Sequence, residues 1–237
     1  MKTLLQTIFA LFSKKRKKGV LIVVDGGDGS GKATQTKLLL ERIARMRKAQ
    51  TTDFPRYNTN HLGGLIRECL DGKRGNFIAL DSRIASVLYA ADRFETLPMI
   101  RKWLEEGNVV ILDRYVSANQ IHQGGKIQDP EARQEFLSWL DKLEFEIFGL
   151  PRPDIIVYLH VPVEISVELA RARAAEKGQA PDSAEKDTRH QLESQQSALA
   201  IVKGANNWVK VECAPEGKLL SREAIHENIF NAIKHLI

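Results

Sequence analysis

A glycine-rich run between an expected strand and an expected helix constrains the fold of this chain more than any other feature. The run GGDGSGK occupies residues 26–32, directly after the apolar residues 20–25 and directly before the helical stretch 34–48. Glycines let the backbone curl so that its N–H groups point inward, the helix adds its positive end, and Lys32 can reach the β- and γ-phosphates of a nucleotide. The spacing G-x-x-x-x-G-K in this setting therefore predicts a phosphate-binding loop. Its expected nucleotide contacts are Gly26, Gly27, Asp28, Gly29, Ser30, Gly31, Lys32, Ala33 and Thr34.

One position of this loop departs from the usual pattern. The residue after the lysine is ordinarily Ser or Thr, whose hydroxyl binds Mg²⁺ opposite the nucleotide, but Ala33 stands there. Thr34 cannot simply replace it, because adjacent residues of a helix point about 100° apart. Either the metal is held by water and by carboxylates elsewhere, or the activity is impaired.

Strand-like and helical patterns alternate along the rest of the chain. Four short runs are β-branched or apolar, of the kind that is buried in a parallel sheet. They are residues 20–24, 109–112, 155–161 and 209–211. The alternation predicts a doubly wound α/β fold with helices on both faces of a parallel sheet. Ligands of such a fold lie beyond the carboxyl ends of the strands.

Two of the expected helices have clear starting signals. Asp129 and Pro130 are typical of an N-cap and a first-turn proline, and Ser221 precedes the last helical pattern. Each helix has one expected apolar stripe. The first consists of Phe136, Leu140, Leu143 and Ile147, and the second of Ile225, Ile229, Ile233 and Leu236.

A third helix, capped by Asp81, combines a stripe with polar neighbours. Ile84, Val87, Leu88 and Ala91 follow the i, i+3, i+4, i+7 pattern, which predicts a buried stripe. Tyr89 and Arg93 then fall beside one another and off that stripe. An aromatic face and a guanidinium could therefore share one ligand, although an aromatic at the margin of an apolar face is also typical of core packing.

The net charge of +5 would fit nucleic acid, an anionic membrane surface or phosphorylated small molecules. It arises from the basic run at residues 14–18 and from scattered arginines, which is not the broad basic, aromatic-studded pattern of a nucleic-acid binder. Small-molecule nucleotides are the expected partners, and nucleic acid is not. Cys69 and Cys213 lie far apart without CxxC or histidine spacing, which favours a reducing, cytoplasmic location over a zinc site or a disulfide.

Residues 1–18 form a basic, amphipathic N-terminal extension, and residues 19–237 are expected to form a single domain. The apolar stretch 4–12 is too short and too interrupted to span a bilayer, so no stable membrane insertion is expected. An organellar targeting peptide, a surface-seeking amphipathic helix and a plain helical extension are all compatible with this segment.

An acidic and a basic residue follow the run 109–112. Asp113 and Arg114 would lie at the same sheet edge as the glycine-rich loop. There, Asp113 could order a Mg²⁺ ion and Arg114 could clamp a phosphate with two hydrogen bonds. A structural salt bridge explains such a pair equally well.

Four segments together resemble the thymidylate kinases, which phosphorylate dTMP with ATP. They are GGDGSGKATQ (26–35), DFPRY (53–57), LYAADRFE (88–95) and DRYVSANQIHQGGK (113–126), in family-like order and spacing. The resemblance runs from about Val20 to the C-terminal helix. It implies a P-loop NTPase fold with a mobile lid, Mg²⁺-dependent phosphoryl transfer from ATP to dTMP in dTTP biosynthesis, and a homodimer.

The resemblance also implies how the phosphate end of the acceptor nucleotide is bound. Asp28 would meet its sugar or phosphate, and Phe54 and Arg56 would line the other side. Arg114 would clamp its phosphate. Lys32 and Arg114 are the expected catalytic residues of this part of the site.

The base would be bound by the second pair of segments. Tyr89 stands where the family places an aromatic that stacks on thymine, and Arg93 where it places an arginine that contacts base or phosphate. Asn119 and Gln123 stand where polar residues read the base edge. Amide groups suit that role because they offer both a donor and an acceptor.

The family resemblance further implies a catalytic lid. Some members carry a catalytic arginine in the phosphate loop, at the position that Gly29 occupies here, and others supply it from the lid. The lid would be residues 171–189, with Arg171 and Arg173 as the catalytic candidates. Lid closure would exclude water and so prevent ATP hydrolysis.

Two further departures from the family pattern bear on these roles. Ser117 and Ala118 stand in the reverse of the usual order, and Arg189 and His190 stand where the lid usually has an acidic residue. Two other functions remain open. One is a kinase of another nucleoside monophosphate or of a deoxynucleoside, and the other is a P-loop nucleotide-binding protein without turnover. A GTPase switch is disfavoured because no Asn-Lys-x-Asp sequence occurs in the chain.

Overall fold

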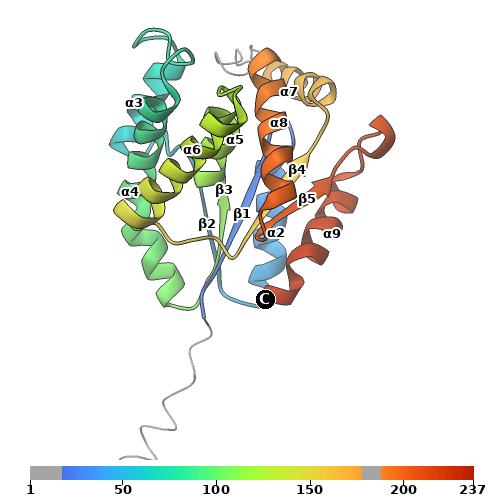
Figure 1. Ribbon diagram of the computed structural model, residues 1–237. Coiled ribbons are helices and arrows are strands. Elements are labelled where there is room, and N and C mark those ends of the chain that lie inside the picture. The colour runs from blue at the N-terminus through green and yellow to red at the C-terminus, as the bar shows by residue number, and fades with distance from the viewer. Residues whose placement is uncertain (1–17, 178–187) are drawn as a thin grey trace, which may run out of the picture.

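Five parallel strands form one sheet in the order β2-β3-β1-β4-β5 (Figure 1). The computed structural model describes residues 18–177 and 188–237, so the N-terminal extension, apart from its last residue, and the middle of the expected lid lie outside the described residues. The strands are β1 (Val20–Gly26), β2 (Ala49–Asp53), β3 (Val109–Asp113), β4 (Ile155–His160) and β5 (Trp208–Glu212). The crossovers between them are helical. The α-helices are α2 (Lys32–Ala44), α3 (His61–Leu70), α4 (Ser82–Glu105), α5 (Val116–Gly125), α6 (Pro130–Asp141), α7 (Val163–Lys177), α8 (Thr188–Gly204) and α9 (Arg222–Ile233).

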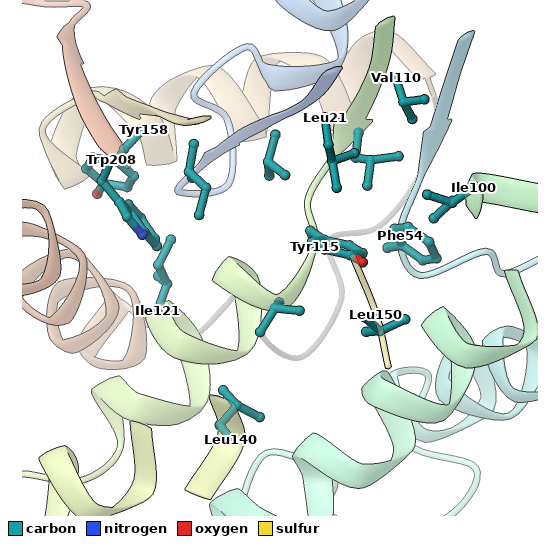
Figure 2. Packing of buried hydrophobic residues seen from close by; sticks show 14 of the residues in the cluster. Leu21, Phe54, Ile100, Val110, Tyr115, Ile121, Leu140, Leu150, Tyr158 and Trp208 are labelled. Atoms are coloured by element: carbon teal, nitrogen blue, oxygen red, sulfur yellow. The ribbon is translucent and has the colours of Figure 1, made fainter. Parts of the chain in front are cut away.

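The three central strands are buried on both faces, as their apolar sequences predict. Alternate residues of β1 face opposite sides of the sheet. Ile22 and Val24 pack with residues of α2 and α9, whereas Leu21 and Val23 pack with residues of α4, α5, α6 and α8 (Figure 2). Helices on both faces of a parallel sheet confirm the expected doubly wound α/β fold.

Strand β2 was not expected from the sequence. Apart from Ala49 its residues AQTTD are polar, and most are half-buried, because β2 lies at an edge of the sheet and pairs with β3 alone among the described strands. The Thr51 hydroxyl donates to the Ile111 carbonyl at 2.8 Å, which satisfies one of these polar side chains. Because β2 follows so closely, α2 ends at Ala44 and not at residue 48.

The buried face of α4 differs from the expected stripe. Ile84 is 58% exposed and Val87 is 40% exposed, so the prediction that they form a buried stripe was wrong. The buried face of its first half instead carries small and polar side chains, including Ser86 and Arg93, and the apolar Leu97 and Ile100 are buried farther along. Arg93 can be buried here because Glu144 and the Tyr115 carbonyl accept its hydrogen bonds.

The stripe expected on the helix after Pro130 also changes direction partway along. Phe136 and Leu140 are buried in α6, but a π-helix, η1 (Lys142–Ile147), follows directly. Its i→i+5 hydrogen bonding widens the turn, so Ile147 is 65% exposed and Glu144 is fully buried. The prediction was therefore wrong for Ile147, and the wider turn directs a carboxylate inward.

None of the helices in the described ranges 18–177 and 188–237 combines the length and apolar character that crossing a bilayer requires.

Candidate nucleotide-binding site

The glycine-rich loop joins the carboxyl end of β1 to the first turn of α2. Gly31 caps α2 with φ 86°, a left-handed conformation that favours glycine. Gly29 also has a positive φ, of 80°, and a Cβ atom there would lie 2.1 Å from the Ser166 carbonyl oxygen of α7. A larger residue at position 29, such as arginine, would therefore require α7 to move.

Lys32 is buried beneath the loop that it helps to form. Its ammonium donates to the carbonyl oxygens of Gly26, at 3.0 Å, and Gly27, at 2.7 Å. Burial and the neighbouring Arg114 lower its pKa to about 8, although nearby carboxylates, including Asp28, oppose the shift. The ammonium thus lies at the curled backbone where the sequence predicts nucleotide phosphates.

Asp28 and Arg114 form an ion pair between the loop and the end of β3. Arg114 has a φ of 66°, an uncommon backbone conformation for a non-glycine residue that often marks a functional position. Burial opposes ionisation of Asp28, but the positive charges of Arg114 and Lys32 outweigh it and lower the pKa of this carboxyl. The two residues expected to contact the acceptor phosphate therefore lie together.

His122 contacts the same pair and was not expected from the sequence. Its Nε2 atom lies 2.9 Å from Nη1 of Arg114. The residue is on α5, three positions after Asn119, so helical spacing places it next to that expected amide on the helix surface. That spacing was the signal available in the sequence.

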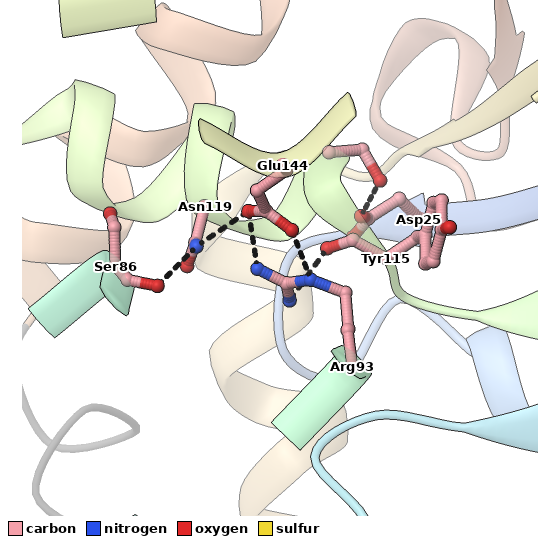
Figure 3. A network of polar contacts seen from close by, with 7 residues as sticks. Asp25, Ser86, Arg93, Tyr115, Asn119 and Glu144 are labelled. Atoms are coloured by element: carbon pink, nitrogen blue, oxygen red, sulfur yellow. Dashed lines mark hydrogen bonds and ion pairs between the residues drawn. The ribbon is translucent and has the colours of Figure 1, made fainter. Parts of the chain in front are cut away.

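A buried polar network joins α4, α5 and η1 (Figure 3). Arg93 donates from Nε and Nη2 to the two carboxylate oxygens of Glu144, each at 2.6 Å, and from Nη1 to the Tyr115 carbonyl at 3.2 Å. The Asn119 amide donates to Glu144 at 3.1 Å and to the Ser86 carbonyl at 3.2 Å. The structure thus brings the expected residues Arg93 and Asn119 together through a carboxylate that the sequence did not reveal.

Two buried polar atoms beside this network have no hydrogen-bond partner among the described residues. They are the Ser86 hydroxyl and the side-chain carbonyl of Gln123. Because buried polar groups are nearly always hydrogen-bonded, such atoms often mark the position of a ligand or a water. Tyr89, with its ring 5.8 Å from that of Phe77, lies half-buried on the same helix as Ser86.

The segment after β2 holds Arg56 against α4 through its backbone and leaves Phe54 in the core. Phe54 is 4% exposed and packs against Tyr115 with ring centroids 6.0 Å apart. The Arg56 backbone N–H donates to the Asp92 carboxylate at 3.0 Å, and the Asn60 amide donates to that carboxylate at 2.8 Å. Asp92 therefore fixes this segment against α4. Its pKa is raised by burial, with these hydrogen bonds opposing the shift.

Ser117, whose order with Ala118 is reversed relative to the family pattern, has a defined contact. Its hydroxyl donates to the buried Asp25 carboxylate at 2.5 Å, and the same carboxylate accepts from the Gly26 N–H at 2.8 Å. The reversal thus ties the first turn of α5 to the end of β1, directly below the loop.

Asp113 provides a carboxylate at the sheet edge where a metal would meet the phosphates. Burial raises its pKa, Lys32 and Arg114 oppose this shift, and the nearby Asp25 and Asp53 add to it. Within the described ranges, no group of three metal-ligating side chains occurs. This donor set fits Mg²⁺, which commonly uses one or two carboxylates together with substrate phosphates and water. Ala33 is exposed and contributes no oxygen from its side chain.

The lid residues are only partly described. Arg171 is exposed on α7. The side chain of Arg173 and residues 178–187 lie outside the described part of the chain.

The parallel sheet with the loop and buried lysine at its carboxyl edge defines the chain as a protein of the P-loop NTPase fold. The thymidylate kinase family model matches residues 24–227. The chain therefore belongs to the thymidylate kinase family.

Individual relatives agree with this assignment. A thymidylate kinase of Mycobacterium tuberculosis is 32% identical over 191 residues, covering 80% of this chain and 87% of the relative. The human thymidylate kinase is 27% identical over 216 residues, covering 90% and 89%. A solved structure of a thymidylate kinase from Candida albicans matches with a TM-score of 0.72 at 24% identity over 92% of both chains, which supports the fold.

Proposed function

We propose that this chain transfers the γ-phosphoryl group of ATP to dTMP, giving ADP and dTDP for dTTP synthesis. Family membership supports the reaction. The observation that carries the proposal is the convergence of Lys32, Asp28 and Arg114 between the phosphate loop and the end of β3. This arrangement can place the phosphates of two nucleotides side by side.

The loop and Lys32 would bind the ATP phosphates, while Arg114 would hold the acceptor phosphate. Phosphoryl transfer requires mainly positioning and stabilisation of negative charge, and the chain offers two cations in one cluster, the buried Lys32 and the partly buried Arg114. Asp28 would orient Arg114 through their ion pair. Arg56, held by Asp92 through its backbone, would contact the acceptor from the opposite side.

The base would lie beside α4 and α5. Tyr89 would stack on thymine, and Asn119 and Gln123 would bind the base edge. Arg93 is 2% exposed, and both of its hydrogen bonds to Glu144 are 2.6 Å long. These bonds fix the orientation of its guanidinium, and we assign Arg93 contact with the base in this orientation only. The unpartnered atoms of Ser86 and Gln123 support a polar ligand at this position.

Asp113 would hold the Mg²⁺ ion that accompanies ATP, directly or through water. When bound, the metal would neutralise charge on the phosphates. Ala33 supplies no hydroxyl to it, so the carboxylate at the end of β3 takes a larger share in its binding.

Arg171 and Arg173 of the lid would supply the remaining positive charge, a role supported by the close approach of Gly29 to α7, which leaves no room for an arginine in the loop.

We further propose a homodimer. Four large apolar side chains are exposed on α4 and η1, namely Ile84, Val87, Phe94 and Ile147, and a partner copy would cover them. Sedimentation of the wild-type chain and of Phe94→Glu would test this assignment. A wild-type monomer at micromolar concentration would contradict it.

The buried, unpaired Cys69 and Cys213 support a reducing compartment such as the cytoplasm.

The reaction is tested by measuring ADP release with Mg²⁺ and ATP while dTMP, dUMP, UMP, CMP, AMP and GMP are offered in turn. The fastest rate is expected with dTMP. Equal rates across the panel would contradict the thymidylate assignment, and no rate with any acceptor would indicate a nucleotide-binding protein without turnover.

A further inference from the structure

His122 lies between Arg114, the proposed clamp for the acceptor phosphate, and helix α8. The sequence motifs did not connect His122 with this helix. On one side its Nε2 atom is 2.9 Å from Nη1 of Arg114. On the other side its Nδ1 atom is 3.3 Å from the Ser194 hydroxyl of α8. The ring is also 5.7 Å from the ring of His190 on the same helix. The imidazole thus links α5, α8 and the end of β3.

The contact with Arg114 determines the protonation of the ring. A guanidinium has only N–H donors, so Nε2 must be the acceptor and must carry no proton. The ring is then neutral with its proton on Nδ1, where it can donate to Ser194. The surroundings agree with this form. Burial and the positive charge of Arg114 hold the pKa of His122 well below its ordinary value; His190 and Lys32 act in the same direction, and Asp28 opposes them.

We propose that His122 is a positioning residue for the reaction, which fixes the Arg114 guanidinium so that it meets the acceptor phosphate. This inference rests on the proposed role of Arg114 as the phosphate clamp. Arg114 is held at one terminal nitrogen by His122 and at the other by Asp28, so rotation of its planar group is restricted from two sides. His122 itself acts through Arg114.

The fixed guanidinium should matter most for the acceptor nucleotide. An arginine that is already oriented loses less side-chain freedom when it binds a phosphate. Without the imidazole acceptor, Arg114 would sample more orientations, and one of its partly buried N–H groups would lose its partner. The ATP phosphates would instead be bound by the loop and Lys32, whose ammonium is held by the Gly26 and Gly27 carbonyls and not by His122.

The kinetic test compares His122→Leu with His122→Gln. The Gln carbonyl can accept from Arg114 at nearly the position of Nε2, whereas Leu cannot. We expect His122→Leu to raise the KM for dTMP about tenfold, the loss of one hydrogen bond to a charged group, with little change in the KM for ATP. His122→Gln should stay within about threefold of wild type on the same scale. His235→Leu, at an exposed position near the C-terminus, is the matched control, and thermal melting checks that each variant folds.

Nitrogen NMR of isotope-labelled histidine in the wild-type protein without nucleotide provides a readout that does not depend on activity. The proposal expects an unprotonated Nε2 and a protonated Nδ1 on His122, unchanged between about pH 6 and about pH 8, across the ordinary histidine pKa. A proton on Nε2, or an unchanged KM for dTMP in a folded His122→Leu variant, would overturn it. If Arg114→Ala leaves the KM for dTMP unchanged while the NMR result holds, the clamp role of Arg114 fails and the contact stands.

Discussion

Removing Glu144 should destabilise the protein far more than removing an exposed partner of the same kind. The Arg93 side chain is 2% exposed and that of Glu144 is 0% exposed, and their two hydrogen bonds are each 2.6 Å long. Loss of one partner from such a pair leaves a buried charge uncompensated and typically costs about 3–5 kcal/mol. In Glu144→Ala the Asn119 amide also loses an acceptor.

This cost converts into a measurable shift. For a chain of this size, 1 kcal/mol corresponds to about 2–4 °C in Tm, so Glu144→Ala should melt about 6–20 °C below wild type. Circular dichroism with heating measures Tm, and urea unfolding measures the free energy of unfolding. Asp141→Ala is the matched control, because the Arg152–Asp141 pair is also held by two hydrogen bonds but its side chains are 58% and 38% exposed. It should lose about 1 kcal/mol or less.

A double variant separates the buried charge from the lost contact. In Arg93→Met with Glu144→Met, both charges are replaced by apolar groups of similar length, and stability should return toward wild type. The KM for dTMP should nevertheless exceed the wild-type value, because Arg93 is replaced and Asn119 loses one of its two acceptors, the Glu144 carboxylate. A loss below about 1 kcal/mol in Glu144→Ala, or equal losses in Glu144→Ala and Asp141→Ala, would refute the reasoning.

Two other predictions concern the phosphate loop. The pKa of Lys32 is lowered to about 8 in the protein without nucleotide, so its charge is present below that pH and lost above it. The kcat/KM for ATP should therefore fall as pH rises through about 8. The same alkaline fall of kcat/KM in Lys32→Arg would contradict this assignment. Ala33→Ser should preserve or raise activity and lower the Mg²⁺ concentration needed for half-maximal rate, because a hydroxyl is added at the usual metal position. A large loss of activity would mean that the site has been rebuilt around alanine.

The sequence predicted those parts of the fold whose signals are local. The apolar run of β1, the glycines after it and Lys32 lie within one short segment, and their roles follow from backbone geometry alone. Strand β2 lacks that signal, because its polar residues are kept in the sheet by pairing with β3 at an edge. Only the tertiary structure identifies it.

The inner face of α4 could not be predicted for a related reason. Ile84 and Val87 have the more apolar side chains, yet Arg93 is the buried one because the Glu144 carboxylate accepts two of its hydrogen bonds. Glu144 in turn faces inward only because a π-helix alters the direction of the chain after α6. The proposed site residues lie in motifs that the sequence itself displays, whereas Glu144 and Asp92, which contact some of them, required the structure.

Phosphoryl transfer to dTMP is measured most directly by following the transferred group itself. ATP labelled in its γ-phosphoryl group is incubated with the protein, Mg²⁺ and dTMP, and the products are separated. The account predicts label in dTDP, strongly reduced in Lys32→Met and in Arg114→Ala, with little label in inorganic phosphate. Label released only as inorganic phosphate, or label in dTDP that both variants leave unchanged, would contradict the account.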